Sequence, residues 1–392
     1  MASRKKLIPI ALGIAVLLGA ALGGWWLVES GYFRTTEDSE AALARIQAQR
    51  LIIDDHEHIQ SLEQLPAVLG AMDALGIGRM VLLGSSWFTI TLNPKVGFSR
   101  YDWNNEQLMQ ICEQHPDRFE AWPTVNPEDP KKLEKFKDYH QRGAVGLKLY
   151  LGHGYVIPRE NRYMFHTMAI DDPSMLPLYE YCEEQFVPVC IHVNPGPKAP
   201  GFADEFLAML RRFPDLKVIC PHFMLSSIRD SRLREFLDTF PNLYSDISFG
   251  FDTFFQAGMK RISKDPDKFR SIFGNYPNRF MFATDMVVTA IDFKNEQWIE
   301  ERLQAYLDML TKKTYTTPHL VDKETGNPVV LRGLALPPQL LERVLYKNYE
   351  DFLALRPRDT QITREIVWSR MGIRRANRKP GQMLPPNAWK TK

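Results

Sequence analysis

Short apolar segments alternate with amphipathic segments along most of the chain, and this alternation predicts the fold. Apolar residues recur every three or four positions in stretches such as 61–75, 104–113, 173–185, 203–212 and 229–238, which predicts helices there. Between such stretches lie eight segments with the character of buried strands: Arg50–Asp55, Gly78–Gly84, Phe119–Val125, Ala144–Leu151, Val187–Val193, Lys217–His222, Leu243–Ser248 and Arg279–Thr284. Alternating strands and helices predict a parallel sheet, and eight such units predict an α/β fold of the closed (β/α)8, or TIM barrel, type.

The alternative α/β fold is a doubly wound open sheet. That fold commonly carries a Gly-x-Gly-x-x-Gly phosphate loop after its first strand, and no such loop follows residues 50–55 here. The closed barrel is therefore the favoured prediction, over residues 50–356.

The first 31 residues have a different pattern. Arg4, Lys5 and Lys6 precede a run from Leu7 to Val28 that contains no charged side chain, and about 20 apolar residues suffice to cross a bilayer as a helix. The run predicts a single membrane anchor, with residues 32–49 as a tether. Because basic flanking residues stay cytoplasmic, we expect the body on the non-cytoplasmic side, periplasmic or extracellular. A cleaved signal peptide is the alternative.

The rest of the composition is that of an ordinary globular protein, at 44% hydrophobic and 24% charged residues. The net charge of +2 is unevenly placed, because residues 356–392 hold ten Lys or Arg against two acidic residues. Residues 357–392 therefore read as an extended basic tail. No aromatic residues interleave with basic ones in the manner of a nucleic-acid surface. The four cysteines show no zinc-finger spacing, and Cys190 and Cys220 are expected to be buried thiols.

Candidate chemistry lies at the ends of the predicted strands. His56 and His58 close the first strand, and residues two apart on a strand project from one face. Other strands carry His192, His222 and Asp285 at or near their carboxyl ends. Active sites of such barrels lie at that end of the strands. The set therefore predicts a metal site, whereas an isolated His-x-His would more often be a pair of surface histidines.

These segments together resemble the amidohydrolase superfamily, and within it the amidohydrolase-related branch known as amidohydrolase 2. The resemblance covers roughly residues 51–355. It is carried by Ile53-Asp54-Asp55-His56-Glu57-His58, Gly146-Leu147-Lys148-Leu149, Asp171-Asp172-Pro173 with Pro188-Val189-Cys190-Ile191-His192, Pro221-His222, Arg279-Phe280-Met281-Phe282-Ala283-Thr284-Asp285, and Leu336-Pro337 through Leu345-Tyr346-Lys347-Asn348. One of Asp54 and Asp55 corresponds to the acidic residue that precedes the His-x-His in this family.

The resemblance implies a ligand set and roles for the site residues. One divalent ion, zinc in the first instance and manganese as the alternative, would be held by His56, His58, His192 and Asp285. Asp285 would also accept the proton of a metal-bound water and pass it to the leaving group. His222 would stay off the metal and orient the water or polarise the substrate's carbonyl oxygen.

On the predicted fourth strand Lys148 is expected to point inward, where a buried ammonium would need a partner. We expect it to contact an anionic group of the substrate. In two-metal members of the superfamily a carboxylated lysine on this strand bridges the ions, so a two-metal site stays open. Further substrate-binding candidates are His153, Tyr155, Arg159 and His166, on the long loop after that strand.

The predicted function is metal-dependent hydrolysis of an amide, lactone or ester bond in a small molecule. The alternative is a non-oxidative decarboxylase using the same metal site, because this branch also supports carbon–carbon cleavage. A barrel retained only for binding is a third interpretation, but no expected ligand is missing. The sequence leaves the oligomeric state open, a homo-oligomer included.

Overall fold

Eight parallel strands form the centre of the protein. The computed structural model describes residues 38–93, 96–151, 156–157, 162–163, 168–193, 202–225 and 230–355. A three-stranded sheet in the order β1-β2-β3 and a five-stranded sheet in the order β10-β9-β8-β7-β4 contain all eight strands. Their bounds are β1 (Ile52–Glu57), β2 (Ile77–Leu83), β3 (Phe119–Trp122), β4 (Leu147–Leu149), β7 (Val189–Ile191), β8 (Val218–Ile219), β9 (Leu243–Asp246) and β10 (Phe280–Met281).

The two sheets join at both edges, so the barrel is closed. Between β3 and β4, Thr124 and Lys148 form a parallel bridge. Between β10 and β1, the amide of Asp55 donates to the carbonyl of Phe282, and the amide of Asp285 donates to that of His56. Each predicted strand is present, and the closed (β/α)8 barrel is confirmed in the part of the chain that the structure describes.

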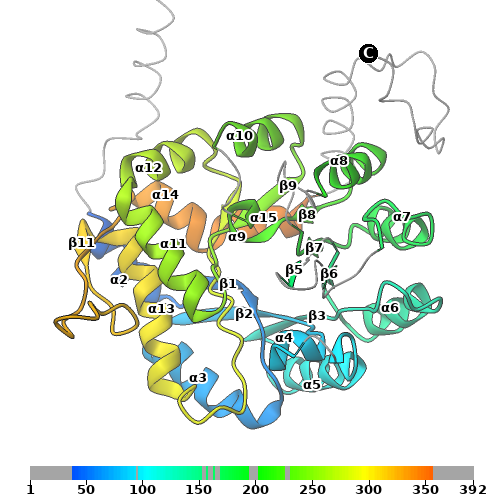
Figure 1. The fold of residues 1–392 in the computed structure, drawn as a ribbon, viewed down its shortest axis with the longest axis horizontal. Coiled ribbons are helices and arrows are strands. Elements are labelled where there is room, and N and C mark those ends of the chain that lie inside the picture. The colour runs from blue at the N-terminus through cyan, green and yellow to red at the C-terminus, as the bar shows by residue number, and fades with distance from the viewer. Residues whose placement is uncertain are drawn as a thin grey trace, which may run out of the picture.

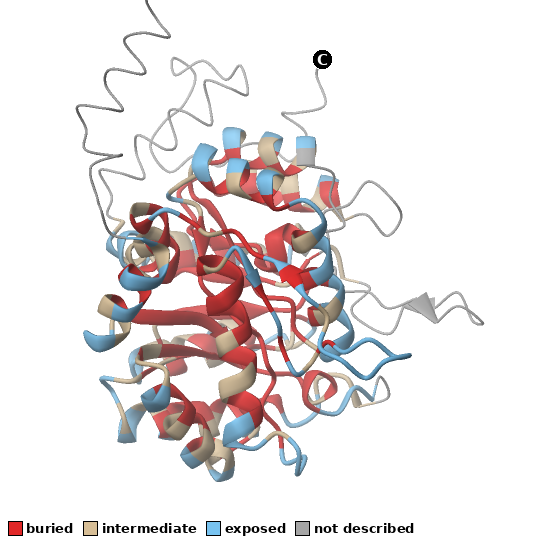
Figure 2. Cartoon of the chain, turned by 90° about the vertical axis from the view of Figure 1, so that its left-hand side faces the viewer, coloured by how far each residue is buried: buried red, intermediate tan, exposed pale blue. Residues whose placement is uncertain are grey.

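Helices surround the strands on all sides (Figure 1). Their apolar faces pack inward against the strands. Buried residues lie on the helix faces toward the strands, and exposed residues lie on the outer faces (Figure 2). The surrounding helices are α3 (Leu65–Ala74), α5 (Tyr101–Gln114), α6 (Lys132–Gln141), α7 (Leu176–Glu184), α8 (Ala203–Arg212), α10 (Asp230–Thr239), α11 (Asp252–Lys264), α12 (Pro266–Asn275) and α13 (Glu296–Thr311).

Smaller elements lie in the connections. They are η1 (Leu62–Gln64), α4 (Trp87–Thr91), the antiparallel pair β5 (Val156–Ile157) and β6 (Arg162–Tyr163), α9 (Pro221–Leu225), and the antiparallel pair β11 (Thr314–Tyr315) and β12 (Leu331–Arg332).

A second apolar cluster fills the barrel interior. Inward side chains of the strands, such as Ile53, Trp122 and Ile219, pack there against Tyr349 and Phe352. The last two belong to the C-terminal segment of α14 (Pro338–Glu342), η3 (Arg343–Lys347) and α15 (Asn348–Ala354). The ammonium of Lys217, just before β8, donates to the Leu353 carbonyl, so α15 closes the amino-terminal end of the barrel. The opposite, carboxyl-terminal end is left for the site.

The folded body begins earlier than the sequence predicted. The described part of the expected tether, 32–49, contains the helix α2 (Ser39–Ala48), which buries Ala42, Leu43 and Ile46. The Asp38 carboxylate caps it by accepting from the Ala41 amide. Polar residues on the outer face of α2 gave it the composition of a linker, while three apolar positions were enough to dock it.

The predicted membrane helix, 7–28, and the basic tail, 357–392, lie outside the described residues. None of the helices that the structure describes is both long and apolar enough to span a bilayer.

Candidate metal centre

The first strand delivers both residues of the His-x-His to one point. β1 continues to Glu57, two residues beyond the predicted end, and its register against β2 shifts between Asp54 and Glu57. His56 and His58, two residues apart, project from the same face of the strand. His56 and His58 are both buried.

Each of three histidines is fixed through its Nδ1 atom. The Nδ1 of His56 lies 2.8 Å from the Asp246 carboxylate, and the Nδ1 of His58 lies 2.7 Å from the Leu83 carbonyl oxygen. The Nδ1 of His222 lies 3.1 Å from the Ser248 carbonyl oxygen. These partners are acceptors, so each ring carries its proton on Nδ1 and presents a lone pair at Nε2. Metal-binding histidines are commonly oriented in this way.

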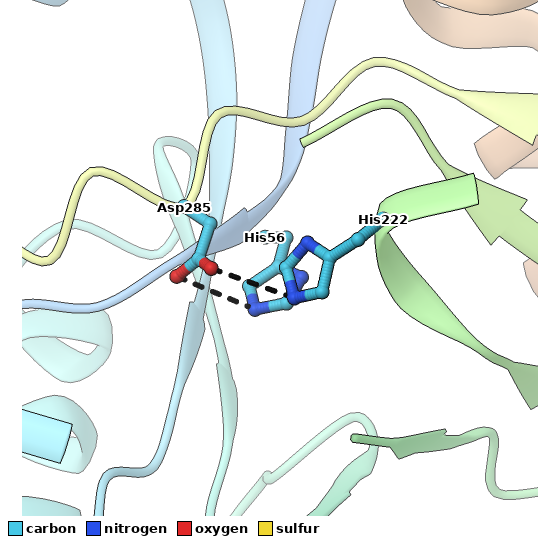
Figure 3. Close-up of side chains that lie close together, drawn as sticks. All are labelled: His56, His222 and Asp285. Atoms are coloured by element: carbon cyan, nitrogen blue, oxygen red, sulfur yellow. Dashed lines mark ion pairs between the residues drawn. The ribbon is translucent and has the colours of Figure 1, made fainter. Parts of the chain in front are cut away.

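The three Nε2 atoms converge with the Asp285 carboxylate. Figure 3 shows His56 and His222 pointing at Asp285 from different elements, with Nε2-to-carboxylate distances of 3.7 and 3.6 Å. His58 Nε2 lies 3.5 Å from Asp285 and 3.3 Å from His56 Nε2. Ligand atoms about 2.1 Å from a tetrahedral ion are about 3.4 Å apart. The lone pairs of the three Nε2 atoms and of the Asp285 carboxylate face one another, and no proton on these nitrogens lies between them. The residues present therefore fit a divalent cation.

The imidazoles of this centre are neutral. Burial, followed by the nearby Lys148 ammonium, lowers the pKa of His56 to about 3. Burial lowers the pKa of His222 to about 4, and the pKa of His58 is also lowered well below its usual value. Protons therefore do not compete for these nitrogens at neutral pH. The pKa of Asp285 is instead raised well above its usual range, by burial first, which makes this carboxylate a stronger base.

Two of the converging residues have left-handed backbone conformations. The φ angle is +61° at His222, at the start of a left-handed turn that continues through Met224, and +52° at Asp285. Non-glycine residues hold such angles at a cost of about 1 kcal/mol or more, and they concentrate at functional sites. A side-chain carbon at Gly250 would lie 2.8 Å from the Asp285 carboxylate. Gly250 thus leaves the space that Asp285 needs.

Buried carboxyl groups of β1 hold the backbone around Asp285. Glu57 accepts from the amides of Met286 and Val287 at 3.0 and 2.9 Å. Asp54 accepts from the Thr284 amide at 3.2 Å and also contacts its hydroxyl. Of the two aspartates considered from the sequence, Asp54 is therefore the one that supports the site, while the Asp55 carboxyl is buried with no hydrogen-bond partner among the described residues.

Lys148 lies directly beside the convergence point. Its side chain is fully buried, and its Nζ lies 3.1 Å from His56 Nε2 and 3.5 Å from Cys190 Sγ. Cys190 and Cys220 are both buried free thiols, as predicted. The inward orientation predicted for Lys148 is thus present.

The structure places some of the predicted site residues closer to the convergence point than others. Ligand atoms of His56, His222 and Asp285 all lie within 4.8 Å of one another. The ring of His192 lies at the end of β7, with its centroid 4.9 Å from that of His222 and 6.1 Å from that of Tyr150. The predicted assignment of His192 to the metal and His222 to the second layer stays a prediction. His153, Tyr155, Arg159 and His166 lie outside the described residues.

Asp246 is the principal residue that the sequence interpretation missed. Its carboxylate also accepts from the His222 amide at 2.8 Å and from the Ser248 amide at 3.0 Å, so it links two of the histidines. It ends β9, and an acidic residue at the carboxyl end of a barrel strand was the available signal.

Comparisons with known proteins agree with this architecture. The sequence model of one protein family, described as Amidohydrolase, matches residues 88–355. That span contains His222 and Asp285 and begins after the His-x-His. A search of curated proteins found no match.

Several solved structures are similar to the chain. A candidate 2-pyrone-4,6-dicarboxylic acid hydrolase from Acinetobacter baumannii, solved with citric acid bound, has a TM-score of 0.50 at 12% identity, over 78% of this chain and 100% of that chain. 2,6-Dihydroxybenzoate decarboxylase from Rhizobium has a TM-score of 0.47 at 15% identity, over 77% and 98%. 5-Carboxyvanillate decarboxylase from Novosphingobium aromaticivorans, solved with manganese and a nitrobenzoic acid, has a TM-score of 0.44 at 15% identity, over 78% and 96%. The first of these likenesses supports the barrel fold.

Proposed function

The chain belongs to the amidohydrolase family, and on this premise we propose that it is a hydrolase that uses one divalent metal ion, zinc in the first instance, on an amide, lactone or ester bond of a small molecule. The observation that carries the proposal is the convergence of three imidazole lone pairs with the Asp285 carboxylate at separations of 3.3 to 3.7 Å. An array of acceptors at this spacing is electrostatically unfavourable without a cation, and it suits zinc.

A divalent ion, when bound, lowers the pKa of its water toward about 7 and polarises a carbonyl oxygen. Asp285 has the position to take the proton from the attacking water, because its carboxylate lies 3.5 to 3.7 Å from the Nε2 atoms of His56, His58 and His222. As the water oxygen bonds to the acyl carbon and the bond to the leaving nitrogen or oxygen breaks, Asp285 returns that proton to the leaving group. His222, held through Nδ1 by Ser248, keeps its Nε2 directed at Asp285.

Non-oxidative decarboxylation is the second candidate reaction. Lys148 supports it, because a buried ammonium beside the metal position would bind the carboxylate of an aromatic or unsaturated acid. In hydrolysis the same ammonium would bind a remote anionic group.

The two reactions differ in their products, and one assay separates them. Purified chain supplied with zinc or manganese would be screened against lactones, amides, esters and hydroxylated aromatic carboxylates, with acid release and CO2 release followed together. The Asp285→Asn variant is the matched control. Turnover with acid release and no CO2 supports hydrolysis; CO2 release in proportion to substrate consumed supports the decarboxylase. Turnover that Asp285→Asn leaves intact would contradict both.

We further propose that residues 7–28 anchor the enzyme in a membrane, with the body on the non-cytoplasmic side. The support is the uncharged run after Arg4, Lys5 and Lys6. Deleting residues 1–31 leaves α2 intact, since that helix begins at Ser39. The truncated chain should be soluble, folded and as active as the full chain. Full-length protein found in the soluble fraction of cells would contradict the proposal.

A further inference from the structure

The Lys148 ammonium holds a position that a metal ion would also use. Its Nζ lies 3.1 Å from His56 Nε2, and the His56 proton is on Nδ1, bonded to Asp246. The ammonium therefore donates to the lone pair that metal binding requires. A cation bound to His56 and Asp285 would lie next to this ammonium. Two positive charges at such a separation in a buried site repel strongly.

No acidic side chain that the structure describes pairs with Lys148. Its contacts at Nζ are His56 and Cys190, and its ammonium lies 5.2 Å from the centre of the Tyr150 ring. A buried ammonium without a carboxylate partner is costly, so its position is held by the acceptors of the metal-free centre. A metal ion would bind these same acceptors, and the Lys148 ammonium would lose its hydrogen bond to His56.

Asp55 offers the displaced ammonium another place. Its carboxyl is buried with an exposed fraction of 2%, and neither oxygen has a hydrogen-bond partner among the described residues. Asp55 lies on β1, one residue before His56. Burial, then Asp246 and Asp54, raises the pKa of Asp55, and Lys148 is close enough to oppose that rise. The Cys190 Sγ lies 3.5 Å from Lys148 Nζ; burial chiefly raises the pKa of this thiol, and the Lys148 ammonium opposes the rise.

We propose that Lys148 is the resident cation of the metal-free centre, that metal binding displaces its ammonium from His56 toward Asp55, and that this exchange sets the metal affinity. The inference rests on the proposed metal site. It assigns Lys148 a positioning role that differs from bridging two metal ions and from the contact with an anionic group of the substrate considered above, and it gives the unpartnered carboxyl of Asp55 a function.

The test is a double-mutant cycle in metal affinity, measured for zinc by chelator competition on the full chain, with no assay of turnover. Lys148→Met and Lys148→Gln remove the competing charge and should each tighten zinc binding by about 10- to 100-fold, the range typical of groups next to metal ligands. Asp55→Asn removes the receiving carboxyl and should weaken binding by about tenfold. In the Lys148→Met background, Asp55→Asn should change the affinity little, because no ammonium has to be received.

The outcomes distinguish this inference from the proposed function. Weaker zinc binding in both Lys148 variants, with a stoichiometry that falls from about two to about one, would identify Lys148 as a bridging ligand and overturn the inference. An equal effect of Asp55→Asn with and without Lys148 would also overturn it, because Asp55 would then act on the site by another route. If the unmodified chain binds no divalent ion, the proposed function fails and the inference with it. Circular dichroism of each variant checks that the barrel is folded.

Discussion

The Asp246→Asn variant tests how the histidines are oriented. One oxygen of the Asp246 carboxylate accepts from His56 Nδ1, while the other accepts from the amides of His222 and Ser248 and from the Ser248 hydroxyl. An asparagine of the same shape can replace only one of these acceptors. If its oxygen serves the two amides, its NH2 group faces His56 Nδ1, and the His56 proton must move to Nε2. The lone pair directed at the metal is then lost.

The expected loss of metal affinity follows from the acceptor that the asparagine cannot replace. Loss of a group that orients a ligand costs about 10- to 100-fold in metal affinity, and the complete loss of the His56 lone pair places Asp246→Asn at the upper end, about 2.7 kcal/mol. The opposite orientation of the amide is no better, because its NH2 group would then face two N–H donors in a buried site. That arrangement costs about 1–3 kcal/mol of folding stability. Weakened metal binding, reduced stability or both are therefore expected.

Zinc affinity by chelator competition and the nitrogen-15 shifts of labelled histidines measure the two parts separately. The shifts should report a His56 protonated at Nδ1 in the unmodified chain and at Nε2 in the variant. Asp73→Asn is the matched control, since it removes the same charge from a half-exposed aspartate that pairs with Arg50 and Arg118. Unchanged zinc affinity together with an unchanged His56 tautomer would refute the reasoning.

Three further variants probe the parts of the site that hold Asp285 and His222. Gly250→Ala places a carbon 2.8 Å from the Asp285 carboxylate at a φ of +73°, so zinc affinity should fall about tenfold; titration of zinc into the variant checks this, and wild-type affinity would contradict it. Glu57→Gln turns an acceptor of the Met286 amide into a group with its own N–H donors. Urea unfolding should show a loss of about 1–3 kcal/mol in the free energy of unfolding; an unchanged free energy would mean that the hydrogen bonds of Glu57 to the backbone near Asp285 do not stabilise the fold. Burial chiefly lowers the pKa of His222 from 6.5 to about 4. Between pH 6.5 and pH 4 the unfolded chain therefore binds a proton at His222 that the folded chain does not, so the stability of the fold falls as the pH falls through this range. The stability difference between the metal-free unmodified chain and His222→Gln should therefore shrink by about 3 kcal/mol from pH 6.5 to pH 4, and a difference that stays constant with pH would show that His222 is not buried in its neutral form.

The barrel could be predicted from the sequence because each strand is a short apolar segment between helical ones. Most strands are shorter in the structure than predicted; β8, for example, covers Val218–Ile219 within the predicted 217–222. β1 and β2 keep the predicted length but are shifted along the chain, to Ile52–Glu57 and Ile77–Leu83. Periodicity reports which segments are buried, whereas register and turns decide where ladder bonding stops.

Which residues bind the metal and which lie behind these ligands was harder to predict than which residues form the site. His192 and His222 both follow apolar strands, and the sequence alone does not separate a ligand from a second-layer residue. His222 begins a left-handed turn, and Asp246 accepts from its amide. Three successive non-glycine residues in this conformation have no sequence signature, because tertiary hydrogen bonds impose it. Asp246 was missed for a related reason, since it acts on imidazoles rather than on the metal.

Metal content of the purified full chain, measured beside its activity, tests the central claim most directly. The account predicts about one equivalent of zinc or manganese per chain, and loss of that ion when His56 and His58 are both replaced by alanine, because the double variant removes two of the converging lone pairs. The folded state of the double variant would be checked by circular dichroism. An enzyme that turns over its substrate fully with no metal bound, or a double variant that retains the ion, would contradict the account.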